Sequence, residues 1–355
     1  MGSRKETPAQ LTQDDYDHFV QALKADENCD IFEFGRKMEL FAVHPKAPNQ
    51  WRQRVLLDTL TRLATPASRN RLLEQAKNNI VRWSQDQGTL DIRACHPVSW
   101  SSASGNVMVV AGDWGDVTLN LSKKYGQTFA VLNMAHAKSP GGGGGYVHGA
   151  PAQEENMFRR TDCHFSLSRE KMYITDTKYF NVVEGDYLYT QQVEDLINAK
   201  DGEVVLDMNT PRFCFRSGET DAAKFHGYQY LAGDDVFPFY EMLAAAEDLR
   251  QDADGKKRTE EEMIAAFDAE SCRKRVRAQF ETLRHKRQRY AVLSAFGCGA
   301  FGNPTEEVAN IYAELLTAYK ADFDLVAFAI FAPGYGPSDN YDQFKQIFAD
   351  RLTSM

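Results

Sequence analysis

The stretch VLNMAHAKSPGGGGGYVHGAPAQEENMFRRTDCHFSL, residues 131–167, carries the strongest local signals in the chain. An apolar run over residues 129–134 has the length of a buried strand. Five consecutive glycines follow at 141–145. Glycine gives up backbone entropy on folding, so a folded protein keeps such a tract where it needs unusual dihedrals or close backbone approach. After seven further residues, Gln153, Glu154 and Glu155 stand at the start of a predicted helix.

The glycines and the acids suit different tasks. Backbone N–H groups without side chains form an anion-binding concavity that fits phosphate. A flexible surface loop is the alternative for the glycines alone, but the preceding strand and the following acids favour a ligand loop. Adjacent residues do not share a helical face, so Glu154 and Glu155 point in different directions and can take different roles.

A second glycine loop lies in LSAFGCGAFGNP, residues 293–304, again directly after an apolar run. The segment GCGAFG fits the bare dinucleotide-binding pattern of a nicotinamide dehydrogenase. No acid follows it at a convincing distance for a ribose, and a dinucleotide site leaves the glycine tract and the QEE triplet unexplained. Two loops of this kind, each after a strand, suit a ligand with two phosphates.

The order of these motifs resembles the microbial-type poly(ADP-ribose) glycohydrolase branch of the macrodomain superfamily. The resemblance rests on GGG, seven residues and QEE, then on the second loop, with a similar lead-in at Leu132–Ala135 and Lys138–Pro140. It covers roughly the last three quarters of the chain. It implies a macrodomain-like three-layer α/β/α fold with a mixed central sheet over residues 91–355, preceded by a helical accessory segment at 1–90.

Hydrophobic periodicity predicts the elements independently of the resemblance. The order strand, helix, strand over 107–134 predicts a mixed α/β sheet. Residues 217–240 read as an irregular insertion. We expect helices at 12–23, 52–63, 68–83, 116–124, 256–289, 305–319 and 341–352, and strands or extended segments at 107–111, 129–134, 172–189, 203–215, 290–296 and 325–331.

The resemblance implies hydrolysis of a glycosidic bond at C1 of a ribose. Such a reaction passes through an oxocarbenium-like transition state and needs an acid for the leaving oxygen and a base for water. One glutamate can serve both steps if burial and a neighbouring charge raise its pKa. By resemblance Glu155 is this acid/base, Glu154 holds the ribose hydroxyls, and Gln153 braces the loop.

The resemblance also assigns the ligand contacts. Asp116 is the candidate that faces the adenine, with Asp113 in reserve. The family chemistry requires no metal and no cofactor, and the sequence shows no metal-like ligand spacing. The expected contacts with ADP-ribose are Asn133, His136, Gly143, Gly144, Gly145, Gln153, Gly297, Cys298, Gly299, Ala300, Phe301 and Gly302.

Three positions depart from the family pattern. His136 stands where relatives often carry Asn or Ser. Asp162 and His164 make the segment after the QEE helix more polar than in relatives. These two residues could recognise a different leaving group, such as the guanidinium of ADP-ribosylated arginine or a carboxylate ester, or they could form a structural hydrogen-bond pair. A protein mono-ADP-ribosyl hydrolase and a non-catalytic ADP-ribose reader therefore stand beside the polymer hydrolase, although a reader has no need of Glu155.

Composition bounds the function class. The chain has 355 residues, 43% hydrophobic and 26% charged, as in soluble globular proteins. A net charge of −9 argues against direct nucleic-acid binding. Six scattered cysteines without a CxxC pair indicate reduced thiols.

Because no signal peptide or membrane-length apolar run is visible, we expect a cytoplasmic or nucleocytoplasmic protein whose partner is the ADP-ribose moiety of a polymer or a modified protein. Linkage specificity, endo or exo cleavage, protein targets and oligomeric state stay open.

Overall fold

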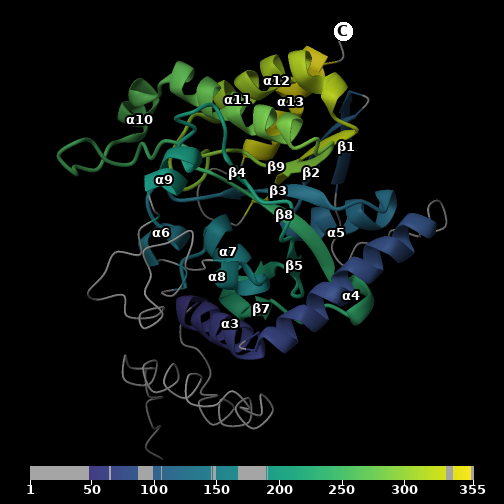
Figure 1. Cartoon of the computed structure of the whole chain (residues 1–355). Coiled ribbons are helices and arrows are strands. Elements are labelled where there is room, and N and C mark those ends of the chain that lie inside the picture. Colours follow the sequence, from purple (N-terminus) through teal and green to yellow (C-terminus); the bar gives the residue numbers. More distant parts are fainter. Residues whose placement is uncertain are drawn as a thin grey trace, which may run out of the picture.

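A mixed β-sheet with helices on both faces forms the centre of the chain (Figure 1). The computed structural model describes residues 48–63, 65–86, 99–104, 106–144, 146, 149–166, 189, 191–332 and 339–352. The helix predicted at 12–23 and the extended segments predicted at 172–188 lie outside the described residues.

Five parallel strands make up the middle of the sheet, in the order β2, β10, β9, β3, β8. Three further strands, β1, β4 and β5, pair antiparallel at its two margins. The carboxyl ends of the five parallel strands therefore share one edge of the sheet. The strands are β1 Ser99–Ser104, β2 Val107–Ala111, β3 Phe129–Met134, β4 Val205–Leu206, β5 Arg212–Cys214, β8 Phe237–Ala244, β9 Tyr290–Leu293 and β10 Leu325–Ile330.

The strand β10 shows why both faces of the sheet carry helices. All six of its residues are buried. Side chains alternate between the faces of a strand. Val326, Phe328 and Ile330 join the core cluster under the C-terminal helices, whereas the other three join the cluster under the N-terminal helices. A strand that is apolar on both faces fits only between two helical layers.

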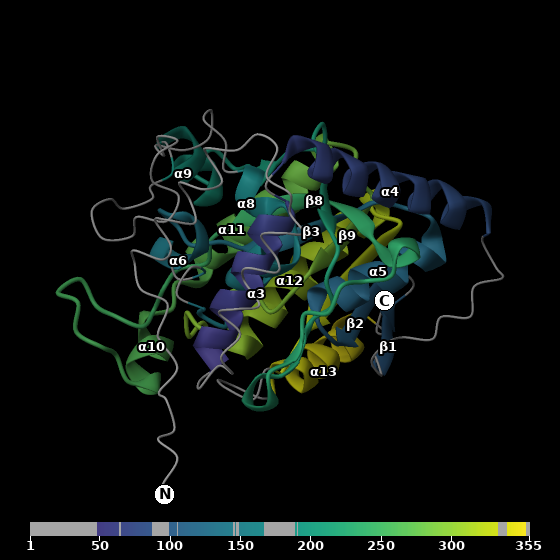
Figure 2. The same ribbon diagram turned by 90° about the horizontal axis from the view of Figure 1, so that it is seen from below.

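The helices cover the two faces as the predicted three-layer fold requires. In Figure 1, α11, α12 and α13 lie above the sheet and α3, α4 and α7 below it, and Figure 2 views the chain from that lower side. The helices are α3 Pro48–Arg62, α4 Pro66–Gln85, α5 Trp114–Tyr125, α6 Pro140–Gly144, α7 Gln153–Arg160, α8 Cys163–Ser166, α9 Gln191–Ile197, α10 Glu260–Ala266, α11 Ala269–His285, α12 Thr305–Tyr319 and α13 Asn340–Leu352. The predicted α/β/α arrangement with a mixed sheet is confirmed.

The helices predicted at 52–63 and 68–83 are present as α3 and α4 and pack on the core. Proline at the first position and the Thr65 side chain, which accepts a hydrogen bond from the Ser68 N–H, start α4. Asn79 donates from Nδ2 to the carbonyls of Gly233 and Val236, both at 2.8 Å. The predicted domain boundary near residue 90 falls within 87–98, outside the described residues, and stays a prediction.

Two predictions about the second half were wrong. Residues 237–240 do not belong to an irregular insertion, because they begin β8, the eight-residue strand that pairs with β3. Pro238 and the helix-favouring sequence EMLA concealed it, and Pro238 pairs with Phe213 on the antiparallel side. The helix predicted at 256–289 is two helices, because Asp268 caps a new start by accepting hydrogen bonds from the N–H groups of Glu270 and Ser271.

The segment 203–215, predicted to be extended, contains two short strands, β4 and β5, that pair with β8. Downstream, β6 Glu219–Asp221 and β7 His226–Gly227 form a small separate sheet. None of the described helices is long and apolar enough to cross a membrane. Among the described cysteines, Cys163, Cys214, Cys272 and Cys298 are buried.

We expect Trp83→Ala to lower the free energy of unfolding by about 3–5 kcal/mol, because the indole ring is fully buried in the core. The Trp83 side chain is 1% exposed. Val81 on the same helix is 55% exposed, so Val81→Ala should change stability by less than about 0.5 kcal/mol. Urea denaturation measures both, and equal effects would contradict the docking of α4.

Candidate active site

A cavity of about 570 Å³ opens at the carboxyl edge of the five parallel strands. Its volume lies in the range of small-molecule sites, and its place is the crevice where open α/β sheets bind ligands. Each parallel strand or the loop after it contributes to the wall. In sheet order these residues are Asp113 after β2, Ile330 and Phe331 at the end of β10, Ser294 and Ala295 after β9, Met134 and His136 at the end of β3, and Ala246 and Arg250 after β8.

The predicted first glycine loop reaches this cavity through Gly142. Gly141 and Gly142 have φ angles of +62° and +61°, in the left-handed region that favours glycine. A Cβ at Gly142 would lie 2.9 Å from Glu155 Oε1, so the loop needs glycine where it passes the acid. Gly143 and Gly144 continue α6, and Gly145 lies outside the described residues.

Glu154 and Glu155 both line the cavity, and both are buried, at 3% and 7% exposure. Glu154 Oε2 accepts a hydrogen bond of 3.0 Å from the His136 N–H. Glu154 Oε1 and Glu155 Oε2 find no hydrogen-bond donor among the described residues. Burial and the charge of Glu155 hold the pKa of Glu154 well above its ordinary value. Burial also raises the pKa of Glu155, although its own backbone N–H and the charges of Arg159 and Arg250 oppose the rise.

Gln153 ties α7 to the end of β3. Its Nε2 donates to the Leu132 carbonyl at 2.8 Å, and its Oε1 accepts from the Met134 N–H at 3.0 Å. The structure therefore gives this residue a bracing contact with the strand. Asn133, in contrast, is fully buried and is not among the cavity-lining residues, since its Nδ2 donates to Glu241 Oε1 at 2.8 Å.

His136 lines the cavity with its imidazole held by the backbone of its own loop. Its Nδ1 accepts a hydrogen bond of 3.2 Å from the Ser139 N–H. Burial lowers the pKa of His136. The His136 ring is therefore a neutral part of the wall at physiological pH, next to the two acids.

The second glycine loop divides into residues that face the cavity and residues that support the turn. Cys298 is 1% exposed, and Gly302, at φ +70°, packs against Met263. Asn303 fixes the turn by donating from Nδ2 to the Gly297 carbonyl at 3.3 Å. Of the predicted ligand residues in this loop, those that line the cavity are Gly297, Gly299, Ala300 and Phe301.

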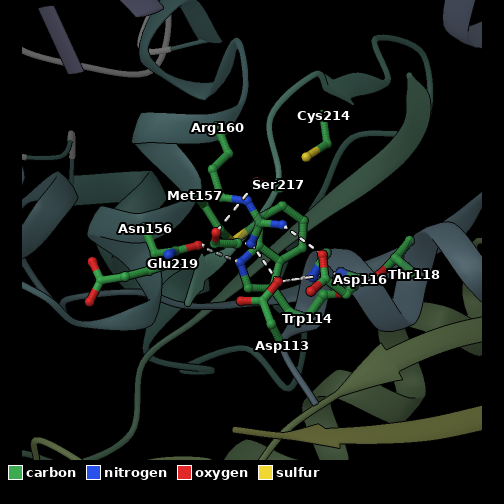
Figure 3. Close-up of polar contacts among 12 residues, drawn as sticks. Asp113, Trp114, Asp116, Thr118, Asn156, Met157, Arg160, Cys214, Ser217 and Glu219 are labelled. Carbon is green, nitrogen blue, oxygen red and sulfur yellow. Dashed lines mark hydrogen bonds and ion pairs between the residues drawn. The ribbon is translucent and has the colours of Figure 1, made fainter. Parts of the chain in front are cut away.

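Asp113, and not Asp116, lies in the cavity wall. Figure 3 shows both carboxylates directed at the guanidinium of Arg160, with Arg160 Nη1 2.5 Å from Asp113 Oδ1 and Nη2 3.5 Å from Asp116 Oδ1. Asp113 also caps α5 by accepting a hydrogen bond of 2.8 Å from the Gly115 N–H. The reserve candidate for the adenine end therefore has the better position.

Asp162 and His164 are not among the cavity-lining residues, so their predicted specificity role is not supported. Asp162 Oδ1 accepts a hydrogen bond of 3.0 Å from the Phe213 N–H, and His164 Nδ1 lies 3.3 Å from Tyr146 Oη. Burial, opposed by Arg212, raises the pKa of Asp162 to about 6. Burial lowers the pKa of His164 to about 3. Their polar groups join α7 and α8 to neighbouring segments.

Two charged residues of the wall were missed in the sequence. Arg250 follows β8, which was itself unrecognised, and Glu219 lies in the segment read as an irregular insertion. Glu219 forms a two-point ion pair with Arg52 of α3, at 2.7 and 2.8 Å. The only signal for Arg250 in the sequence is that Asp248 and Arg250 follow the apolar residues 242–246.

We expect Arg160→Leu to lower the free energy of unfolding by about 3–5 kcal/mol, because it leaves Asp113 and Asp116 largely buried without their cation. Arg273 is the matched control, since it also pairs with two carboxylates, Glu270 and Glu314, but on the outer face of α11. Arg273→Leu should cost about 1 kcal/mol or less. Denaturant unfolding of both variants checks the contrast, and similar losses would contradict it.

We expect Asp162→Asn to change how stability depends on pH. Because burial raises the folded-state pKa of Asp162 from 3.8 to about 6, the stability linked to its protonated form is full below pH 3.8 and is lost as pH rises through 6. Asparagine does not titrate. The variant should therefore gain roughly 3 kcal/mol relative to the parent between pH 4 and pH 7, measured by urea unfolding at each pH. The exposed control Asp254→Asn should track the parent, and a pH-independent difference for Asp162→Asn would contradict the burial argument.

Comparison with known proteins gives a family match and several similar structures. Residues 61–195 match the sequence model described as microbial-type PARG, catalytic domain. The search of curated proteins gives no match. Among solved structures, the chain is similar to poly(ADP-ribose) glycohydrolase (PARG) from Thermomonospora curvata, at 20% identity over 83% of this chain and 98% of that one with a TM-score of 0.48. It is also similar to the Deinococcus radiodurans enzyme in complex with ADP-ribose, at 20% identity over 78% and 92% with a TM-score of 0.44.

The matched segment 61–195 contains α4, β3, the first glycine loop and α7. The second loop, at 297–302, lies beyond it. The resemblance to the microbial-type poly(ADP-ribose) glycohydrolase family, inferred above from the two loops and the acids, is confirmed by this match of residues 61–195 to the catalytic-domain model.

Proposed function

We propose that this protein is an ADP-ribosyl glycohydrolase that cleaves the glycosidic bond at C1 of the distal ribose of poly(ADP-ribose). The observation that carries the proposal is a pair of buried carboxyl groups, each with one oxygen that no described group engages, facing a cavity between two glycine loops. Both carboxyls lie in the segment that matches the catalytic domain of the family.

Glu155 is the proposed acid/base. Burial raises the pKa of Glu155, which favours the protonated form that can donate to the oxygen leaving C1. As the C1–O bond breaks, that proton passes to the leaving oxygen and positive charge develops on the ribose. Water then adds to C1 and returns a proton to the Glu155 carboxylate. The products are a chain end or side chain with a free hydroxyl and an ADP-ribose unit with a hydroxyl at C1.

Glu154 has a different proposed part. One of its oxygens is held by the His136 N–H, and the other has no partner among the described residues. It is therefore proposed to hydrogen-bond a ribose hydroxyl, and its pKa, raised by burial and by the charge of Glu155, favours its neutral form beside that residue.

The remaining wall suits the rest of an ADP-ribose unit. The glycine loops offer backbone N–H groups for the two phosphates. Asp113, after β2, lies where the adenine is expected, several strands away from the acids, which are tied to β3. In the proposed orientation, the adenine lies near Asp113 after β2, and the reacting ribose lies near the acids at the end of β3.

A mono-ADP-ribosyl hydrolase acting on arginine is the second candidate, and a non-catalytic reader the third. The mono-ADP-ribosyl candidate loses its motivating feature, because Asp162 and His164 are not among the cavity-lining residues. A non-catalytic reader does not account for the buried carboxyl group of Glu155 in the cavity wall. The cytoplasmic or nucleocytoplasmic location inferred from the sequence stays an expectation, as does the absence of a cofactor.

We expect Glu155→Gln to lower the rate of ADP-ribose release from poly(ADP-ribose) by about 10²–10⁴-fold, because the amide keeps the shape and removes the titrating proton. Affinity for ADP-ribose, measured by calorimetry, should be retained. Glu314→Gln, on the surface of α12 with a 51% exposed side chain, should match the parent. Near-normal turnover by Glu155→Gln would rule out this acid/base.

The substrate assignment is tested in the same assay with arginine-linked mono-ADP-ribosylated protein in parallel. Release from the polymer supports the proposal. Release from arginine alone would move the function to the second candidate. Binding of ADP-ribose with release from neither would leave the reader.

A further inference from the structure

Arg250 lies in the cavity wall beside the second glycine loop. The parallel strands run in the order β2, β10, β9, β3, β8, and Arg250 follows the last of them. The acids on α7 are tied to the end of β3, next to β8. The charges of Arg250 and Glu155 interact, so Arg250 lies beside the proposed acid/base.

The Arg250 guanidinium is held in place before any ligand arrives. Its Nε and Nη2 donate to Asp248 Oδ1 and Oδ2 at 2.8 and 2.6 Å, a bidentate pairing that fixes the plane of the group. Its Cζ lies 5.3 Å from the centroid of the Phe301 ring, within the range of cation–π contact.

The backbone beside Arg250 is fixed as well. The Leu249 N–H donates to the Phe301 carbonyl at 2.9 Å, which docks this loop on the second glycine loop. The Arg250 side chain remains 51% exposed. Its Nη1 makes no hydrogen bond to any described residue, so part of a rigid cation stays available to a ligand.

Charge makes this position distinct. Among the described residues that line the cavity, Arg250 is the only arginine or lysine, and four carboxylates line the same wall. The hydrogen bond to Asp248 and the charge of Glu155 both raise the pKa of Arg250. A fixed cation beside the proposed acid/base suits an anion that belongs to the leaving side of the bond being cut.

We propose that Arg250 and Phe301 form a subsite for the leaving group, with the guanidinium binding a phosphate of the adjoining ADP-ribose unit and the ring packing against its sugar or base. The inference rests on the proposed function and adds to it a preference for polymer over substrates whose leaving group carries no phosphate. Arginine is suited to this task because its fork matches phosphate oxygens.

Two substrates measured side by side test the subsite. The first is poly(ADP-ribose), and the second is ADP-ribose that carries an uncharged aryl ether at C1 of the distal ribose. For Arg250→Gln we expect kcat/KM on the polymer to fall about 10–100-fold more than on the aryl ether, the range for loss of a charge-assisted hydrogen bond. The two leaving groups differ in their need for acid catalysis, so Arg250→Lys, which keeps the positive charge beside Glu155, is needed to separate the leaving-group contact from an effect on the pKa of Glu155.

Arg284→Gln is the matched control. Arg284 also pairs with one carboxylate through Nε and Nη2, to Glu281 on the surface of α11, and the ratio should not move. Arg250→Lys keeps the charge and loses the fork, so its ratio should fall between those of the parent and Arg250→Gln. Thermal unfolding checks that the variants are folded.

The outcomes separate the inference from the proposed function. If the parent cleaves both substrates and Arg250→Gln leaves the ratio unchanged, the subsite is wrong and the hydrolase stands. If the parent binds ADP-ribose but cleaves neither substrate, the proposed function fails and the subsite fails with it. A selective loss on the polymer supports both.

Discussion

The attachment of α7 to the end of β3 is the constraint on which the site depends. Two consecutive residues make three hydrogen bonds there: the Gln153 side chain donates to the Leu132 carbonyl and accepts from the Met134 N–H, and the Glu154 carboxylate accepts from the His136 N–H. These backbone groups are two residues apart, so they point to the same side of an extended chain. The next residue of the helix, Glu155, turns away from the strand towards Gly142. The two neighbouring carboxylates therefore differ: that of Glu154 is anchored to the backbone after β3, and that of Glu155 is the proposed acid/base.

The helix that presents the acids also carries the charges that compensate for their burial. Arg159 is fully buried and lies four residues after Glu155, on the same face of α7. It donates to Tyr228 Oη at 2.9 Å and to the Ala150 carbonyl at 2.8 Å, and its charge opposes the rise of the Glu155 pKa. Arg160 points to the other side, where it holds Asp113 and Asp116 at the start of α5. The acid end and the expected adenine end of the cavity are therefore connected through one short helix.

Sequence reasoning found the parts of the site that follow from local pattern. The strands β2, β3 and β10 were predicted nearly to the residue because each is a short apolar run between turn signals. Gln153, Glu154 and Glu155 were recognised from their spacing to the glycine tract. The choice between Asp113 and Asp116 was not accessible in this way, because it depends on the cap of α5 and on a buried arginine forty-odd residues away in the chain. Asn133, Cys298 and Gly302 were expected at the ligand, but they are not among the residues that line the cavity. Asn133 is instead hydrogen-bonded to Glu241, and Gly302 packs against Met263.

The unrecognised strand β8 had the largest consequence. A strand with proline near its start and a helix-favouring end gives a weak local signal, and its place is fixed by pairing with β3 over six residues and with β4 and β5 on its other side. Those partner strands lie far away in the sequence. Pairing with them does not show in the local hydrophobic pattern of residues 237–244. Since Arg250 is positioned by β8, the one cation of the described cavity wall was missed with it. The proposed acids were accessible from local sequence pattern, whereas the proposed leaving-group contact depends on the residues after β8, whose position exists only in the folded chain.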